Sequence, residues 1–233
     1  MPHALSRSRR VATAARWPLG VSLTAWRYMW RTTPMHRSEV VGDPERDAPP
    51  PLPSWLDRDE LQHVEAGVGP LFHRRYSARI RGASCTPEEL VASVRKDVDS
   101  VAPPELASFQ KVRGDAGDMQ RNDEYVVRMP APWDGPVRVV EVTPASFRLV
   151  TLGGHLEAGQ IEFRAEPQDG MLRFTIESWA RNGDRFGEFL YDRLRMAKEV
   201  QLHIWTSLIE RVADRVGGRL TGGIEIVTRR IDG

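Results

Sequence analysis

The feature that most constrains the fold is a change of hydrophobic period near residue 184. Before it, short segments alternate apolar and polar side chains, which is typical of strands with one buried face. After it, residues 184–216 show helical spacing, which predicts one helix about 50 Å long at 1.5 Å per residue. Its apolar arc covers more than half of the circumference, so we expect the helix to be covered from two sides.

Six segments between residues 107 and 180 alternate in this way, and turns containing Gly, Pro or Asp separate them. Short connections favour antiparallel neighbours. Residues 71–82 and 224–228 are predicted strands as well. The fold class that follows is α+β, a curved antiparallel sheet of about seven strands wrapped on the long C-terminal helix. The six segments are 107–113, 123–130, 136–143, 146–153, 158–166 and 171–180.

A capping box predicts a further helix between the first strand and the other six. Thr86 is the expected N-cap, Pro87 takes the first helical position and Glu89 the third. We expect this helix to run to about residue 98, before two consecutive prolines.

The alternation also assigns the two faces of the sheet. Leu172, Phe174 and Ile176 share one side of their strand, and the charged residues between them share the other. We expect the apolar side to face the core. The simplest interpretation of the charged side is a solvated ladder of opposite charges.

Composition narrows the class of protein. Hydrophobic residues make up 40% of the 233 residues and charged residues 28%, which excludes collagen-like, coiled-coil and wholly disordered chains. The net charge is only +1, so no overall field points to nucleic acid or anionic lipid. The one cysteine, Cys85, suits a reducing compartment, and we interpret it as structural or incidental.

The N-terminal part differs from the rest. Residues 1–37 hold seven Arg and no acidic residue. We predict a basic, aromatic-rich arm (1–41), a Pro-rich linker (42–54) and a main domain (55–233). Three Trp within Trp17–Trp30 fit three alternatives: packing against the domain, lying on a membrane surface, or contacting a protein partner. No run reaches the roughly 18–20 apolar residues of a membrane span, so we expect a cytoplasmic protein, peripheral at the membrane if the arm docks there.

Four phrases carry a resemblance to a known superfamily. The chain resembles the helix-grip fold of the START-like (SRPBCC) superfamily and, more narrowly, an uncharacterised bacterial family known only as a domain of unknown function. The resemblance covers about residues 65–216. It implies a cavity between sheet and long helix that holds apolar small molecules or lipids, and some superfamily members are enzymes, such as aromatic polyketide cyclases. The phrases are GVGPLF (67–72), GHLEAGQ (154–160), FTIESW (174–179) and MAKEVQ (196–201).

Polar residues that break an inward-facing apolar pattern are candidates for ligand binding. Gln201 lies near the centre of the helix's apolar arc, close to Trp205. A buried amide without partners costs about 1–3 kcal/mol, so Gln201 must bond to the sheet, to water or to a ligand. Arg74 and Tyr76 share the inward side of the first strand. Each of these two residues has two possible roles: it contacts a ligand, or it forms a salt bridge or hydrogen bond at the edge of the core.

His155 is the candidate for acid–base catalysis, because it follows two glycines at a strand end and stands two residues before Glu157. Glu141 is a second candidate carboxylate. The alternative role of His155 is to stabilise the turn. His203 falls on the polar arc of the long helix, where we expect a solvated side chain.

Other chemistries have little support in the sequence. The six His show no ligand spacing and one Cys cannot build a thiolate site, so we expect no metal. No glycine-rich loop has a phosphate-binding context, and we expect no cofactor and no nucleic-acid partner. The leading hypothesis is a protein that binds an apolar small molecule or lipid in an internal cavity. The alternatives are a cyclase, hydrolase or lyase that uses His155, and a docking protein that uses its arm.

Overall fold

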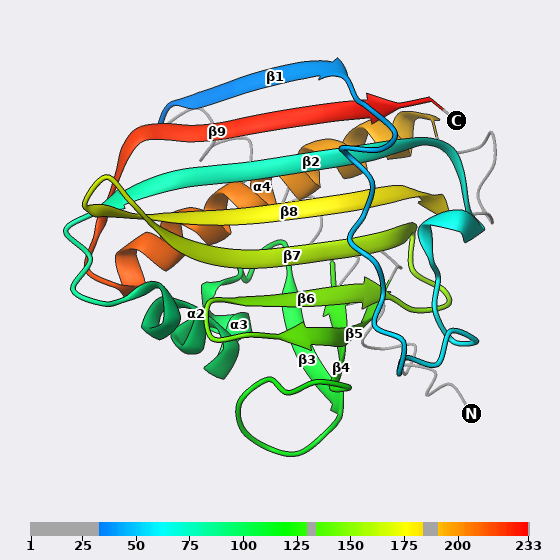
Figure 1. Ribbon diagram of the computed structural model, residues 1–233, viewed down its shortest axis with the longest axis horizontal. Helices are drawn as coiled ribbons and strands as arrows, with labels where there is room; N and C mark the ends of the chain where they lie inside the picture. Colours follow the sequence, from blue (N-terminus) through cyan, green and yellow to red (C-terminus); the bar gives the residue numbers. More distant parts are fainter. Residues whose placement is uncertain (1–32, 130–133, 184–190, 233) are drawn as a thin grey trace.

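The computed structural model describes residues 33–129, 134–183 and 191–232, and those residues form one nine-stranded sheet with a long C-terminal helix (Figure 1). The strand order is β1-β9-β2-β8-β7-β6-β5-β4-β3. The strands are β1 (Met35–Val41), β2 (Gly67–Arg81), β3 (Ser108–Arg113), β4 (Glu124–Arg128), β5 (Asp134–Val142), β6 (Ser146–Thr151), β7 (Glu157–Gln168), β8 (Met171–Gly183) and β9 (Arg219–Ile231). The helices are η1 (Val64–Ala66), α2 (Pro87–Lys96), α3 (Val98–Val101) and α4 (Tyr191–Arg215).

The α+β class is confirmed, and the six alternating segments form β3 to β8. The count of about seven strands is wrong, because the described residues form nine. The sheet is also mixed rather than wholly antiparallel, since β1 pairs with β9 in parallel. Strand β1 is exposed at nearly every position, so its sequence lacks the alternation that a half-buried strand shows. Its residues lie within the predicted arm (1–41), but in the structure they form the edge strand of the sheet.

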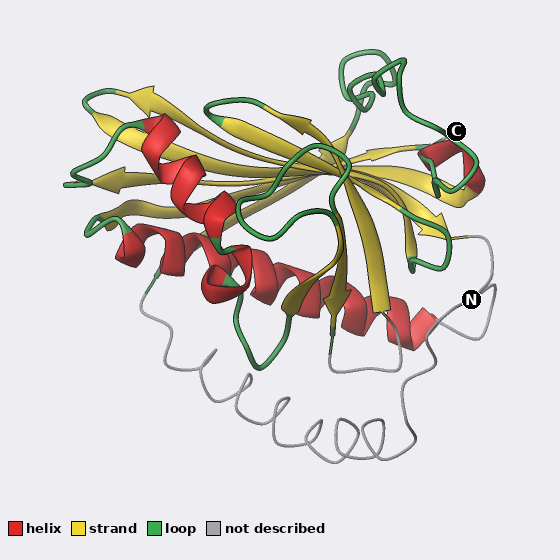
Figure 2. Ribbon diagram, turned by 90° about the horizontal axis from the view of Figure 1, so that it is seen from below, coloured by secondary structure: helices red, strands yellow, loops and turns green. Residues whose placement is uncertain are grey.

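The inner face of the sheet packs on α4, and the largest core cluster lies between them (Figure 2). Phe147, Phe163, Phe174 and Ile176 project from the strands into this cluster and are fully buried. Leu208 and other apolar residues of α4 meet them, as the two periodicities predicted. The apolar side of the predicted ladder therefore does face the core.

Helix α4 is covered from more than one side. Its C-terminal half also meets α2 and α3, where Arg211 donates to Ser100 O at 3.1 Å and Arg215 donates to Ser93 O at 3.0 Å. The expectation that His203 is solvated is wrong, because the residue is only 6% exposed. Thr206, one turn further on, is buried as well. The polar arc of this helix is thus partly enclosed.

Helix α2 begins as its capping box predicted. Thr86 Oγ1 accepts from the Glu89 backbone N–H at 3.2 Å, and Glu89 Oε2 accepts from the Thr86 N–H at 2.9 Å. Two of the unpaired N–H groups of the first turn are therefore satisfied. The helix ends at Lys96, and α3 follows after one residue.

Residues 42–66, the covering segment, cross the outer face of the sheet on the side opposite α4 (Figure 1). Leu52 and Leu56 pack there against Val140 and Val150. The charged ladder is therefore only partly solvated: Thr175 and Glu177 are buried, whereas Glu166 is exposed. Buried residues of this face include His73, Arg148, Gln160 and Glu177.

Two expectations fall on residues outside the described ranges. The aromatic part of the arm (Trp17–Trp30) is one of them, and the predicted helix start at 184–190 is the other. Among the residues that the structure describes, no helix has the length and apolar character needed to cross a membrane.

Candidate functional site

Three polar side chains meet between the inner face of the sheet and α4, and we call them the inner cluster: Arg74 of β2, Glu157 of β7 and Gln201 of α4. Gln201 Nε2 donates to Glu157 Oε2 at 2.6 Å. Arg74 Nη1 lies 3.6 Å from Glu157 Oε1. The carboxylate thus links the helix to the sheet and holds a cation on its other oxygen. The Gln201–Glu157 contact joins residues 44 positions apart in the chain.

Strand alternation brings these groups to one face. Glu157 is the first residue of β7 and shares its inward side with the core residue Phe163. Arg74 shares the inward side of β2 with Tyr76, which is 3% exposed. Burial raises the pKa of Tyr76 to about 12, while the Arg74 charge opposes the rise and the Glu157 charge adds to it. The phenol is therefore neutral at physiological pH.

An apolar surface adjoins the inner cluster. Trp205 meets Phe163 edge to face with ring centroids 5.7 Å apart, and Phe163 stacks on Phe147 at 4.7 Å. Ile161, on the inward side of β7 between Glu157 and Phe163, is only partly buried, as are Trp205 and Gln201. The inner face here combines charged, amide and apolar groups, and several of them keep accessible surface.

Arg74 is itself enclosed and 7% exposed. Its guanidinium lies 4.7 Å from the centroid of the Phe72 ring, a cation–π contact. A distance of 3.6 Å to Glu157 is an ion pair rather than a short hydrogen bond. Among the described residues, Arg74 is thus positioned by the Phe72 ring and by a loose ion pair with Glu157.

His155 does not pair with a carboxylate among the described contacts. Its Nδ1 accepts from the Glu157 backbone N–H at 2.9 Å, and the Glu157 carboxylate turns to Gln201 instead. Burial lowers the pKa of His155, although the nearby Glu157 charge and a hydrogen bond with the Glu157 backbone oppose this, and the lowered pKa favours the neutral ring. The ring also packs on Gly135, where an added Cβ would lie 2.9 Å from Nε2. The arrangement stabilises the turn that precedes β7.

Glu141 lies away from these groups. Its Oε2 accepts from Arg148 Nη2 at 2.6 Å. Arg148 projects from β6 to the outer face, because it alternates with the core residues Phe147 and Leu149. The three candidate catalytic residues are therefore divided between the two faces of the sheet.

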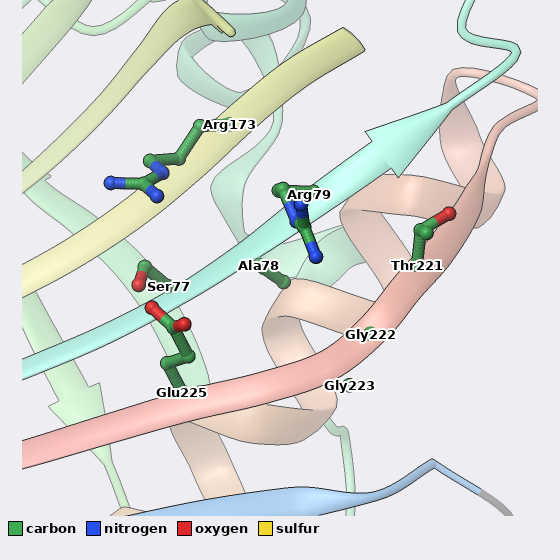
Figure 3. A pocket seen from close by; sticks show the side chains of 8 residues that line it. All are labelled: Ser77, Ala78, Arg79, Arg173, Thr221, Gly222, Gly223 and Glu225. Atoms are coloured by element: carbon green, nitrogen blue, oxygen red, sulfur yellow. The ribbon is translucent and has the colours of Figure 1, made fainter. Parts of the chain in front are cut away.

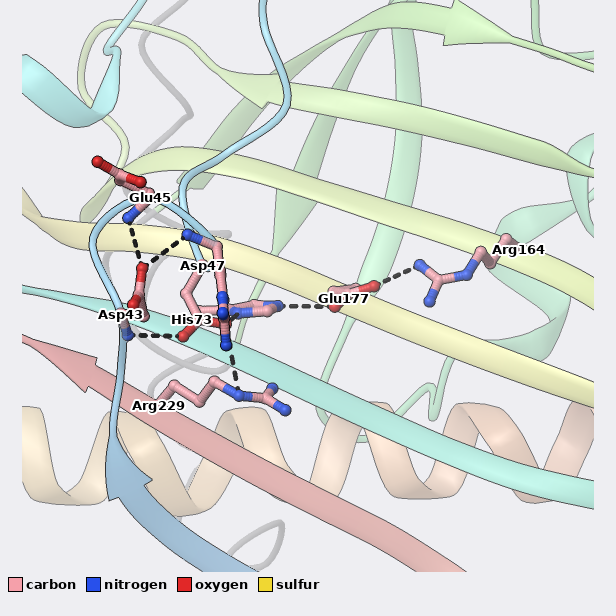
Figure 4. Close-up of polar contacts among 8 residues, drawn as sticks. Asp43, Glu45, Asp47, His73, Arg164, Glu177 and Arg229 are labelled. Atoms are coloured by element: carbon pink, nitrogen blue, oxygen red, sulfur yellow. Dashed lines mark hydrogen bonds and ion pairs between the residues drawn. The ribbon is translucent and has the colours of Figure 1, made fainter.

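A second polar group on the outer face has no counterpart in the sequence analysis (Figure 4). We call it the outer cluster: Asp47, His73, Arg164, Glu177 and Arg229. His73 Nδ1 lies 2.9 Å from Asp47 Oδ1, and His73 Nε2 lies 2.6 Å from Glu177 Oε1. Both ring nitrogens of His73 therefore face carboxylate oxygens, one from the covering segment and one from β8. Arg164 donates to the other Glu177 oxygen, and Arg229 pairs with Asp47 at 3.4 Å.

The carboxylates of the outer cluster are held ionised. Burial alone would raise the pKa of Glu177, but hydrogen bonds from His73 and Arg164 lower it to about 2. Burial likewise opposes ionisation of Asp47, and the Asp43 backbone N–H together with His73 lowers the pKa of that group. His73 also stacks on Trp179 at 5.1 Å. The cluster joins Asp47 of the covering segment to side chains of β2, β7, β8 and β9, so it fastens the covering segment to the sheet.

Sequence alternation could place His73 and Glu177 on the outer face, but it could not supply their third partner. Asp47 lies in the Pro-rich segment, which has no period that would assign it a face. Among the described residues, no three His, Cys, Asp or Glu side chains group as the ligands of a metal ion would.

The covering segment also reaches the inner cluster through Gln62. Its Nε2 donates to His155 O at 2.7 Å and to Glu157 O at 3.2 Å, and the Gly154 N–H donates to its Oε1 at 3.0 Å. One amide side chain thus holds the backbone of the turn from which the Glu157 carboxylate projects.

A family model described as a domain of unknown function (DUF1990) matches residues 62–211. The search of curated proteins found no match. Among solved structures, similarity extends to the protein Ara h 8.0201, with 13% identity, a TM-score of 0.43 and coverage of 62% of this chain and 97% of that one. A protein from Thermus thermophilus has 12% identity and a TM-score of 0.47, with coverage of 62% of this chain and 96% of that one. A conserved protein from Geobacillus kaustophilus has 14% identity and a TM-score of 0.41, with coverage of 64% of this chain and 98% of that one. Likeness of this strength carries no conclusion about ligand or activity.

Proposed function

This chain belongs to the DUF1990 family, and from that premise we propose that it is a helix-grip protein of the START-like type that binds an apolar small molecule or lipid between the sheet and α4. The observation that carries the proposal is the inner cluster, a charged and amide group beside partly buried apolar side chains. A site of this kind holds the body of a ligand by burial and its orientation by a few polar groups.

The parts of the site have separate roles in this proposal. Trp205 and Ile161 contact the apolar body of the ligand. Arg74 donates to an acceptor oxygen on the ligand, since its present ion pair with Glu157 is loose at 3.6 Å. Gln201 and Tyr76 position the carboxylate and close the polar end. Ligands with an oxygen function at one end of an apolar chain or ring system therefore suit the site.

Native mass spectrometry tests the proposal on the full-length protein, purified gently and then incubated with dodecanoic acid or dodecan-1-ol. We expect a mass excess that denaturation removes, either from a co-purified molecule or from one of the two probes. Gln201→Leu should lose at least about tenfold in probe affinity, because it removes the amide that holds Glu157. Gln110→Leu, the same change at an exposed position of β3, should bind as the wild type does.

The opposite result is clear in the same experiment. A wild-type protein that carries no co-purified molecule and takes up neither probe contradicts the proposal. Equal binding by the wild type and Gln201→Leu would mean that the protein binds a ligand but that the inner cluster is not part of the binding site.

A further inference from the structure

Four arginines gather at one end of the outer face, beyond the covering segment, and we call them the arginine corner: Arg79, Arg81, Arg173 and Arg219. In register, Arg79 of β2 stands directly opposite Arg173 of β8, and Arg81 stands opposite Arg219 of β9. Like charges directly opposite one another on neighbouring strands are destabilising. Two such pairs at one corner are therefore a cost that the fold carries in the absence of a counter-charge.

The described carboxylates do not neutralise this corner. Glu166 stands opposite Arg173 in register and Glu225 lies near Arg79, yet neither is within ion-pair distance of any of the four arginines in the described part of the chain. Arg173 Nε donates to Gln168 Oε1 at 2.7 Å, which is a neutral partner. Four guanidinium groups thus face two carboxylates, which leaves the corner positive.

A small pocket opens between these strands (Figure 3). Arg79 and Arg173 line it together with Ser77 and Thr221, and Glu225 stands on its wall. The guanidinium groups of Arg79 and Arg173 turn away from one another in Figure 3, as expected of like charges with nothing between them.

A bulge in β9 makes room for the pocket. The register moves from Ala78 opposite Ile224 to Arg79 opposite Thr221, which leaves Gly222 and Gly223 unpaired with β2. Both have positive φ, 77° and 81°. A Cβ at Gly222 would lie 2.8 Å from Arg79 Nη2, so the glycine also keeps space for the guanidinium.

We propose that the arginine corner binds a phosphate-type oxyanion at this pocket, a site independent of the proposed ligand between sheet and α4. Guanidinium groups donate planar pairs of N–H bonds that match the oxygens of phosphate, and the Ser77 hydroxyl is a further donor at the pocket. Glu225 gives the site a preference, because its carboxylate accepts a hydrogen bond from a protonated oxygen and repels a bare dianion. Hydrogen phosphate, which keeps a proton at neutral pH, therefore fits better than sulfate, which carries none.

Calorimetric titration of the full-length protein with sodium phosphate, in a buffer free of phosphate and sulfate, is the first test. We expect saturable binding, with sulfate several-fold weaker, and Glu225→Gln should remove that preference. The double variant Arg79→Gln/Arg173→Gln should bind at least about tenfold more weakly, because it removes two sets of charge-assisted donors. Arg46→Gln, a change at an exposed arginine of the covering segment, should bind as the wild type does.

Stability separates this role from a structural one. In phosphate-free buffer, Arg173→Gln should unfold at no lower temperature than the wild type, since it removes a repulsion. Phosphate should raise the unfolding temperature of the wild type and not that of the double variant. A double variant that is folded and still binds phosphate as the wild type does would overturn the proposal.

The phosphate group can belong to a free molecule or to a lipid headgroup, and vesicle sedimentation distinguishes the two. Phosphatidic acid presents a phosphate monoester, whereas phosphatidylcholine does not. If the wild type sediments with phosphatidic acid vesicles and the double variant does not, the ligand is the lipid headgroup. If the wild type binds free phosphate but does not sediment with the vesicles, the ligand is a soluble anion. Failure of the wild type in both experiments would refute the site and leave the proposed ligand between sheet and α4 unaffected.

Discussion

Glu177 is the residue through which the outer cluster is joined, because it bonds His73 with one oxygen and Arg164 with the other. Replacing it with Gln removes the negative charge that faces the His73 ring and the Arg164 guanidinium. We expect Glu177→Gln to lower the free energy of unfolding at pH 7 by about 2–4 kcal/mol. Chemical denaturation checks this, with Glu45→Gln, an exposed carboxylate of the covering segment, as the control. A loss below about 0.5 kcal/mol would mean that the cluster contributes little to stability.

The same residue predicts an acid dependence. Its pKa is lowered from an ordinary 4.5 to about 2 in the folded protein, so folding favours the ionised form. That stability is present above pH 4.5 and is lost as the pH falls toward 2. Allowing for solvent screening, we expect about 1–2 kcal/mol from this group, with Asp47 acting in the same direction. Unfolding temperatures between pH 6 and 2.5 should fall less steeply for Glu177→Gln than for the wild type, and parallel curves would contradict the assignment.

Among the elements, the covering segment is attached to the sheet at several points, including the apolar contacts of Leu52 and Leu56 and the ion pair of Glu60 with Arg138. Near its N-terminal end the charged anchor is Asp47 of the outer cluster. Asp47→Asn keeps a hydrogen-bond acceptor but removes the charge that faces His73 and Arg229. We expect amide hydrogen exchange in residues 42–52 to rise about tenfold, which is a local opening made easier by about 1.4 kcal/mol. Asp59→Asn, an exposed change in the same segment, is the control. If β2 and β8 exchanged faster to the same extent, the cluster would be holding the sheet itself.

Elements with a half-buried face were predictable, and elements without one were not. Alternation located β3 to β8 because one side of each meets the core. Strand β1 lacks that signal, since its side chains after Met35 are exposed and its backbone pairs with β9. The covering segment lacks it too, because prolines hold its backbone extended and its contacts are scattered single residues.

At the level of the complete fold, the inner face of the sheet is mainly apolar and the outer face is mainly polar, and Gln62 connects the cover of the outer face to the inner cluster. The alternation of side chains along β2 predicted that Arg74 and Tyr76 lie on the inward side of the strand. The helical spacing of α4 predicted that Gln201 lies on the apolar side of the helix. The contact between Gln201 and Glu157 could not be predicted, because it depends on how far along the sheet α4 is set. His73 looked like any outward polar residue until the fold brought Asp47 to it from 26 positions away.

Gln62 joins these two faces, since it lies in the covering segment and bonds the backbone of Gly154, His155 and Glu157. Gln62→Ala should leave three hydrogen bonds unmade, of which water replaces part, and lower the free energy of unfolding by about 1–2 kcal/mol. The specific expectation is local: the Gly154 amide should exchange at least about tenfold faster, because its acceptor is gone.

Hydrogen exchange by NMR, with Gln120→Ala as an exposed control, measures this effect directly. Since the freed turn carries Glu157, the variant should also retain a bound ligand several-fold less well in native mass spectrometry. Faster exchange confined to the covering segment, with Gly154 unchanged, would show that the outer cover and the inner cluster are mechanically separate. Faster exchange at Gly154 without any change in ligand retention would place the ligand elsewhere than at Glu157.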